Sequence, residues 1–383
     1  MTSISTLLPT YATVNLTALA HNLSCIKRYL SPGCEVMAIV KANAYGHGAV
    51  ETAQALARQG IGRFAVASLD EGIALRQAGL SAPIVVLGAL FEAQIADLVA
   101  HQLTPVVSDG GILPTLAKAA RSHATPYPIH LKVETGMGRL GFSPEELLSL
   151  LDNPLLRSPL QVEGMMTHLA DADGADSDFT ERQLGVFRAM LEQIRQRGLS
   201  IPLVHTANSA AIVRFPGAHF SLVRPGIMLY GYHTLPASVS TPDLIPVLSL
   251  RTTIVQLRTI PRGGTVSYNG TFVAQRPTRI AVLPIGYADG YSRRLSHRGS
   301  VLIQGRRAPI VGLVCMDMIM VDVTDLAPVP VGETVTLIGQ QGGESIWADE
   351  VADWIGTIPY EVLCGIGSRV PRLYEFAARD GRD

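Results

Sequence analysis

The chain has 383 residues, enough for two domains, and its formal net charge of −1 offers no large basic surface for nucleic acid or an acidic membrane. Hydrophobic residues make up 47% of the chain and charged residues only 16%, which indicates much buried surface and fits a subunit interface. The sequence shows no secretory signal, no apolar run long enough to cross a bilayer and no CxxC pair. We therefore expect a cytoplasmic protein.

Residues 12–238 alternate between short apolar strands and longer helical stretches such as 178–198. Strands are expected at 35–40, 63–68, 83–88, 104–108, 129–134, 162–167, 202–206 and 221–224. Eight strand–helix units in roughly 220 residues are typical of a (β/α)8 TIM-type barrel, which belongs to the α/β class. A doubly wound open sheet is the competing architecture, although it would rarely use eight strands in such regular succession.

The pattern changes after about residue 236, within a linker rich in Pro and Ser (233–246). Beyond the linker, β-rich stretches alternate with Gly and Pro turns, and strands are expected at 252–260, 278–287, 300–305, 307–323 and 333–339. We predict a second, mostly β domain over residues 239–383, to which residues 1–11 are assigned.

Polar side chains stand at the ends of several predicted barrel strands, where barrel enzymes carry their reactive groups. Lys41 directly follows the first strand, in the sequence VKANAYGHG (40–48). Other strand ends and the loops after them present Lys132, Arg139, His168, His205, Asn208, Ser209 and Arg224. A lone lysine at a strand end could equally extend its ammonium into solvent. Convergence of so many polar groups on one rim favours a shared site.

The loops after the seventh and eighth strands indicate what the site binds. TANSAA (206–211) and RPGI (224–227) offer a hydroxyl, small residues and unpaired N–H groups at helix starts, which suit a phosphate. A lysine beside a phosphate site suggests the cofactor pyridoxal 5′-phosphate (PLP). No residue pattern predicts a metal site.

Nine motifs spread along nearly the whole chain resemble the alanine racemase family in sequence and in order. They are VKANAYGHG (40–48), LKVETGMGRLGF (131–142), MMTHLADAD (165–173), HTANSA (205–210), VRPGIMLYG (223–231), VSYNGTF (266–272), IGYADGY (285–291), VCMDMIMVD (314–322) and YEVLCGIGSRVPR (360–372). The chain departs from the family near its start, where LPTYATVNL (8–16) replaces the usual Arg–Pro. The resemblance implies a PLP-dependent isomerase that interconverts L- and D-alanine, supplies D-alanine for peptidoglycan of the bacterial cell wall, and forms a homodimer with shared active sites.

The resemblance also implies a role for each matching residue. Lys41 would bind PLP and act as one catalytic base, and Tyr268 would be the second base, reaching into the other subunit with Met316 and Asp317. The expected phosphate ligands are Tyr45, Asn208, Ser209, Gly226, Ile227 and Tyr360. Arg224 would face the pyridine nitrogen, with His168 bridging towards it.

The remaining roles concern the substrate. Arg139 would bond the phenolic oxygen of the cofactor and seat the substrate, and Met316 would line the substrate pocket. Lys132, often carbamylated in this family, would be an anion that fixes Arg139. Tyr287 would help to form the entrance. His205 is expected to be a structural core histidine.

These implied roles are chemically consistent with one another. Racemisation removes a proton from one face of Cα and returns one to the other, so two bases on opposite faces are the simplest solution. A tyrosine is a poor base unless cations stabilise its phenolate, and Arg224 and His168 are the expected cations. A guanidinium opposite the pyridine nitrogen stays protonated, so the ring remains a weaker electron sink.

Three other functions remain open at this point. A PLP-dependent amino-acid decarboxylase shares the barrel and β-domain plan, but it would want an acid where Arg224 stands. A non-catalytic PLP carrier would need only the barrel, so the presence of the β domain with Tyr268 argues against this function. A racemase of the same fold that also accepts serine differs by one hydroxyl in its substrate, which such a pocket rejects only modestly.

Overall fold

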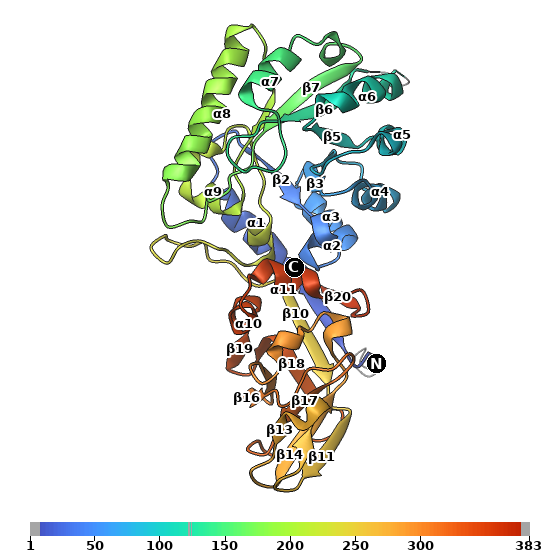
Figure 1. The fold of residues 1–383 in the computed structure, drawn as a ribbon, viewed down its shortest axis with the longest axis vertical. Helices are drawn as coiled ribbons and strands as arrows, with labels where there is room; N and C mark the ends of the chain where they lie inside the picture. The colour runs from blue at the N-terminus through green and yellow to red at the C-terminus, as the bar shows by residue number, and fades with distance from the viewer. Residues whose placement is uncertain (1–7, 122, 124, 377–383) are drawn as a thin grey trace, which may run out of the picture. The chain divides into compact units, whose positions relative to one another are not determined.

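The computed structural model describes residues 8–121, 123 and 125–376. The chain divides into two compact units (Figure 1). The barrel unit comprises Leu19–Ala44 and Ala49–Leu244. The C-terminal unit comprises the N-terminal segment as far as Ala18, the short segment Tyr45–Gly48, and the chain from Ile245 onwards.

The barrel unit is built on an eight-stranded parallel sheet in the order β8-β7-β6-β5-β4-β3-β2-β9. Its strands are β2 (Glu35–Ile39), β3 (Arg63–Val66), β4 (Ile84–Val86), β5 (Thr104–Val107), β6 (Tyr127–Lys132), β7 (Leu160–Met166), β8 (Leu203–His205) and β9 (Leu222–Val223). Two backbone hydrogen bonds, Ser221 N to Val204 O and Arg224 N to Ala207 O, bring the two edges together. The predicted barrel and all eight of its predicted strands are therefore confirmed, and the barrel is nearly closed.

Helices surround these strands, with α4, α5 and α6 along one side and α8 along another (Figure 1). The helices are α1 (Leu16–Lys27), α3 (Ala49–Arg58), α4 (Leu69–Gln77), α5 (Ile95–Ala100), α6 (Leu113–Ala120), α7 (Pro144–Leu150), α8 (Asp178–Gln196) and α9 (Ser209–Arg214). Helix α8 buries Leu184, Phe187 and Ile194, a three-to-four spacing that gives it one apolar face.

Several polar side chains are buried in the core of the barrel unit, although branched apolar residues dominate the interior of this fold. His130, Lys132, His205 and Arg224 are each at most 4% exposed. Buried polar groups persist only where hydrogen bonds or charges compensate them, so these residues mark the interior as functional rather than purely structural.

The C-terminal unit is mostly β, as predicted. Its strands are β1 (Tyr11–Asn15), β10 (Leu248–Thr253), β11 (Gln256–Ile260), β12 (Thr265–Val266), β13 (Phe272–Val273), β14 (Thr278–Leu283), β15 (Ser300–Ile303), β16 (Arg306–Pro309), β17 (Ile319–Asp322), β18 (Thr334–Gln341), β19 (Glu344–Ile346) and β20 (Arg372–Glu375). The largest sheet has the order β16-β15-β18-β10-β1-β20, with β19 on β18, and a second sheet has the order β11-β14-β17. Helices α10 (Ala348–Ile355) and α11 (Pro359–Gly365) complete the unit.

Two predicted strands of this unit are each divided in the structure. The stretch 252–260 forms the end of β10 and then β11, which belong to different sheets. The stretch 307–323 forms β16 and β17, and the irregular segment between them carries Met316 and Asp317. Continuous apolar runs do not reveal such breaks, because the chain can leave one sheet and join another without a change in composition.

The division between the units differs from the expected boundary at 238/239, because it lies between Leu244 and Ile245. Residues 12–18 group with the C-terminal unit although they were assigned to the barrel. The reason is strand pairing, since β1 lies antiparallel to β10 and parallel to β20. Residues 1–7, which were also assigned to the β domain, lie outside the described residues.

Candidate active site

Lys41 stands at the end of β2, where the backbone enters an unusual turn, α2 (Lys41–Tyr45). The φ angles of Ala42, Asn43, Ala44 and Tyr45 are 51°, 53°, 52° and 54°. This is the left-handed region, which costs about 1–2 kcal/mol for each residue that carries a side chain. Such strain persists only where the surroundings over-determine it, and it is common at functional sites.

Three hydrogen bonds fix the turn within the barrel unit. Glu71 accepts one from the N–H of Ala42 at 2.6 Å, Asn43 accepts one from the N–H of Ala49 at 2.9 Å, and Ala44 donates one to Val40. Glu71 was not predicted as a site residue. A local signal existed, because Ser68 and Glu71 form a capping box at the start of α4.

A group of cations surrounds the same end of the barrel. Burial and then the cations Arg139 and Arg224 lower the pKa of Lys132 to about 8, and Lys41 contributes to the same shift. Arg139 lies on the exposed loop after β6, where its N–H donates to Glu134. The structure therefore brings together Lys41, Lys132, Arg139 and Arg224, as the sequence predicted for the rim of the barrel.

His168 belongs to this group, but it is neutral. Burial and then Arg224 and Arg139 lower its pKa to about 3. Its Nδ1 lies 3.3 Å from Nη2 of Arg224, which can only donate, so this nitrogen accepts. The expectation that His168 is a cation is therefore wrong, because burial and then four neighbouring positive charges oppose its protonation.

Arg224 is 4% exposed and held by five hydrogen bonds. Nη1 contacts the carbonyl oxygen and Nδ1 of His205 at 2.7 and 3.2 Å. Nη2 donates to the carbonyl oxygens of Thr167 and Thr206 at 2.9 and 3.0 Å. Burial lowers the pKa of Arg224 to about 9, which still leaves the guanidinium charged at pH 7.

The loops after β8 and β9 form a small cradle of backbone N–H groups. Asn208 caps α9 by accepting from the N–H of Ala211. The hydroxyl of Ser209 accepts from the N–H of Gly226 at 3.0 Å and of Met228 at 3.4 Å. Ile227 begins the 3₁₀ helix η6 (Ile227–Tyr230) directly after Gly226. Four residues predicted to bind phosphate therefore lie together.

The donor set of the barrel unit fits an anionic cofactor such as PLP. Four cations gather at the rim and His168 is uncharged, so positive charge predominates there. A dianionic phosphate bound beside Ser209 and the start of η6 would balance this charge. The chemistry of the residues and the expected cofactor therefore agree.

A second cluster of predicted residues lies in the C-terminal unit. Tyr268, Met316 and Asp317 line a hollow of about 430 Å³ together with Ser267, Cys315, Met318 and Met320. Tyr268 is 63% exposed and Met316 is 52% exposed, which is unusual for large apolar side chains. Asp317 accepts a hydrogen bond from Arg369 at 2.9 Å.

Three further tyrosines of the prediction lie in this unit. The rings of Tyr45 and Tyr360 are in contact, with centroids 5.8 Å apart. Burial, with Tyr360 and Cys364 nearby, raises the pKa of Tyr45, so its hydroxyl stays protonated. Tyr287 is exposed, and its backbone N–H donates to the carbonyl oxygen of Cys315 beside the hollow.

Helices that could span a membrane do not occur among the described residues between 8 and 376.

Comparisons with known proteins match both units to one family. The family described as "Alanine racemase, N-terminal domain" matches residues 14–234, and "Alanine racemase, C-terminal domain" matches residues 247–374. The alanine racemase of Carboxydothermus hydrogenoformans is 45% identical over 367 residues, which cover 96% of this chain and 99% of that protein. The alanine racemase of Halothermothrix orenii is 43% identical over 367 residues, covering 96% and 97%.

Solved structures give the same result. The alanine racemase of Bacillus anthracis with bound L-Ala-P has a TM-score of 0.90 and 37% identity, covering 98% of this chain and 96% of that one. The alanine racemase of Bartonella henselae with covalently bound pyridoxal phosphate has a TM-score of 0.85 and 32% identity, covering 96% and 99%.

Proposed function

Because the chain belongs to the alanine racemase family and interconverts L- and D-alanine, we propose that Lys41 and Tyr268 are the two bases of this reaction. The family uses PLP, which supplies an electron sink for the loss of a Cα proton. The observation that carries the proposal is the position of Lys41, on a strained turn at a rim that collects cations. Strain and charge together mark this lysine as functional.

The proton transfer needs one base on each face of Cα. Lys41 removes or returns the proton on one face, and Tyr268 does the same on the other. A proton lost to one base is matched by a proton given by the other, so the two bases exchange protonation states in each turnover. Both then return to their starting states by exchange with solvent.

The other barrel residues hold the cofactor and orient the substrate. Arg224 stays cationic, and beside the pyridine nitrogen it would limit how far the ring withdraws electrons. Arg139 would bind the phenolic oxygen and seat the substrate, and Lys132, as a carbamate, would fix Arg139. The cradle of Asn208, Ser209, Gly226 and Ile227 would hold the phosphate, and the hydroxyls of Tyr45 and Tyr360 are the further donors that the family resemblance implies.

Tyr268 acts in a homodimer, where it enters the barrel of the other subunit together with Met316 and Asp317. The support for this step is exposure, since a 63% exposed tyrosine and a 52% exposed methionine line one hollow in the C-terminal unit. An interface would cover such a patch. Tyr287, which lies beside the segment that carries Met316 and Asp317, would help to form the entrance to the active site.

The cellular role follows from the reaction. We place it in the cytoplasm, where D-alanine would be supplied for peptidoglycan. All four cysteines, each in the described part of the chain, carry no disulfide bond, which fits a reducing compartment.

The two-base assignment is tested by proton exchange in deuterated water. With two bases, deuterium enters the product enantiomer early, while the remaining substrate keeps its protium. Tyr268→Phe should lose racemisation by at least about 100-fold, the lower range for a general base, yet still exchange the Cα proton of one enantiomer. Borohydride should fix the cofactor to the native protein but not to Lys41→Ala. Tyr29→Phe is the control for Tyr268→Phe, because it makes the same substitution at a tyrosine outside the predicted site.

Other results would contradict the assignment. Exchange of both enantiomers by Tyr268→Phe, or borohydride fixation at a residue other than Lys41, would assign the bases elsewhere. Release of carbon dioxide from any amino acid would favour a decarboxylase. L-serine assayed in parallel with L-alanine measures the breadth of the substrate range.

A further inference from the structure

A chain of hydrogen bonds leads from Arg224 through the interior of the barrel unit to the opposite side of its core. Nδ1 of His205 lies 3.2 Å from Nη1 of Arg224, and Nε2 of His205 lies 2.8 Å from Nδ1 of His130. Nε2 of His130 lies 3.3 Å from Oε2 of Glu163. Both histidines are 0% exposed, so neither can exchange these partners for water.

The chemistry of the groups gives this chain one direction. The guanidinium of Arg224 has only N–H groups, so Nδ1 of His205 must accept. Burial lowers the pKa of His205 and of His130, so each ring is neutral and carries a single proton. That proton lies on Nε2 of His205, which donates to Nδ1 of His130. The proton of His130 then also lies on Nε2, and it donates to the carboxylate of Glu163.

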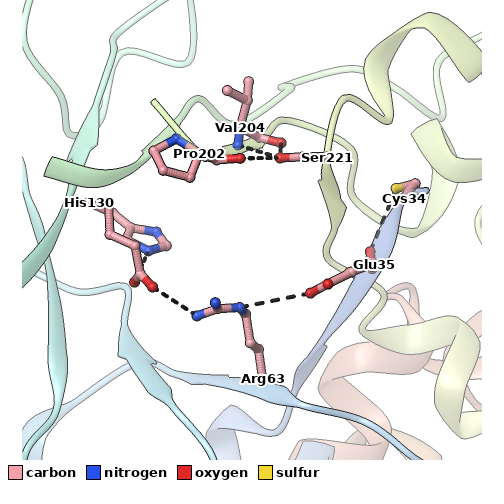
Figure 2. A network of polar contacts seen from close by, with 8 residues as sticks. Cys34, Glu35, Arg63, His130, Pro202, Val204 and Ser221 are labelled. Carbon is pink, nitrogen blue, oxygen red and sulfur yellow. Dashed lines mark hydrogen bonds and ion pairs between the residues drawn. The ribbon is translucent and has the colours of Figure 1, made fainter. Parts of the chain in front are cut away.

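Glu163 is the acceptor at the end of this hydrogen-bond chain, away from Arg224. The hydrogen bond from His130, together with the nearby Arg63, lowers the pKa of Glu163, so it is ionised at neutral pH. Nη1 of Arg63 lies 3.2 Å from Oε1 of Glu163, and its Nε lies 3.9 Å from Glu35. Figure 2 shows Arg63 with Glu35 on one side and His130 beyond its other side.

Local backbone features are consistent with the contact between His130 and Glu163. The pairing of β6 and β7 shifts register between Ile129 and His130, so that Ile129 pairs with Val162 and His130 pairs with Gly164. Glu163 is therefore the extra residue of a bulge, a feature that re-aims a side chain. A Cβ on Gly164 would lie 2.6 Å from Nδ1 of His130, so only glycine leaves room for the ring.

We propose that Glu163 and His130 are positioning residues, which fix the tautomer of His205 and so hold the guanidinium of Arg224 towards the ring nitrogen of the cofactor. The proposal rests on the proposed role of Arg224. If His205 carried its proton on Nδ1, two N–H groups would face each other at Arg224, and the guanidinium would have to move. The carboxylate of Glu163 excludes this tautomer, because it can only accept from His130.

The test reads the tautomers directly. The full chain is labelled with ¹⁵N-histidine, and two-bond ¹H–¹⁵N spectra are recorded with and without PLP. We expect His130 and His205 both to be protonated on Nε2 in the native protein. Detection of a protonated Nδ1 on His205 there would overturn the proposal without any substitution. The readout depends on neither Lys41 nor Tyr268, so it fails or succeeds separately from the two-base assignment.

Substitutions then test the consequence. Glu163→Leu removes the acceptor, and we expect mixed tautomers at His205, a shift in the visible absorption of bound PLP and about tenfold weaker PLP binding. Glu163→Gln keeps one acceptor oxygen, so it should largely keep the native tautomers, the native absorption and the native PLP affinity. The matched control is Gln161→Leu, which places the same side chain on β7 in the same cleft of about 510 Å³ that Glu163 lines.

Either of two results contradicts the proposal. Glu163→Leu could keep native tautomers, absorption and PLP affinity, or Gln161→Leu could change them as much as Glu163→Leu does. If Glu163→Leu does not fold, the spectra of the native protein and of Glu163→Gln decide, because native tautomers in both are required.

Discussion

The carboxylate of Glu71 accepts a hydrogen bond at 2.6 Å from the backbone N–H of Ala42, which lies 29 residues earlier in the chain. The other oxygen of Glu71 accepts from the N–H groups of Ala67 and Ser68 at 2.7 and 3.3 Å. One side chain therefore joins the end of β3 to the left-handed turn that begins after Lys41. This contact therefore helps to fix the backbone position of Lys41, from which its side chain extends.

Glu71→Gln should weaken this connection, because the amide group presents N–H donors where one oxygen now accepts. We expect the free energy of unfolding to fall by about 1–3 kcal/mol and kcat/KM for racemisation to fall about tenfold. Chemical denaturation and steady-state assays measure the two effects. Asp70→Asn is the control, because Asp70 is also a carboxylate in the first turn of α4. Equal effects of the two substitutions would contradict the prediction.

Gly46 follows the left-handed turn and lies against α11 in the C-terminal unit. Its φ is +83°, and a Cβ there would collide with the carbonyl oxygen of Leu363. Gly60 has a φ of +84°, but a Cβ there would meet nothing within 4 Å. Gly46→Ala should therefore lower the free energy of unfolding by about 1–3 kcal/mol more than Gly60→Ala does, which chemical denaturation can measure. Equal losses would show that the collision is relieved without cost.

The neutral His168 should make stability depend on pH. Its pKa is about 3 in the folded chain, against the ordinary value of 6.5, so between these values the unfolded chain binds a proton that the folded chain does not. Stability therefore rises with pH through this window and is fully present above it. His168→Gln should reduce the slope of unfolding free energy by up to about 1.4 kcal/mol per pH unit between pH 4.5 and 6.

Denaturation without PLP measures this slope, since cofactor affinity then plays no part. His130 and His205 remain in both proteins and contribute equally, so the difference between the slopes belongs to His168. Identical slopes would show that His168 is protonated in the folded chain, and the charge assigned to it would be wrong.

Lys132 should react with carbon dioxide. Its pKa of about 8 leaves much of the amine neutral at pH 8, and the neutral amine adds carbon dioxide and releases a proton to give a carbamate. The resulting anion would be stabilised by Arg139 and Arg224. A ¹³C NMR signal for a carbamate should appear in ¹³C-bicarbonate, vanish in Lys132→Ala and persist in Lys118→Ala, which removes an exposed lysine. A carbamate signal that survives in Lys132→Ala would place it elsewhere.

Several features of this protein could be predicted from the sequence because they depend on short stretches of chain. The strand at 35–40 is confirmed as β2, and the regular succession of such runs indicated the barrel. Burial of an apolar run depends mainly on its own composition and period, so no partner needs to be known. The family motifs likewise identified the cations that gather near Lys41.

Tertiary structure decided the contacts between residues far apart in the chain. The left-handed turn at Ala42, the bulge at Glu163 and the neutral charge of His168 have no signal in their neighbouring residues. Each depends on which strands lie side by side and which charges they bring close. His130 and His205 are 75 positions apart in the chain, yet Nδ1 of His130 lies 2.8 Å from Nε2 of His205. They meet because their strands, β6 and β8, are the two neighbours of β7 in the sheet. Composition determined what could be buried, whereas strand order determined which polar groups had to satisfy one another there.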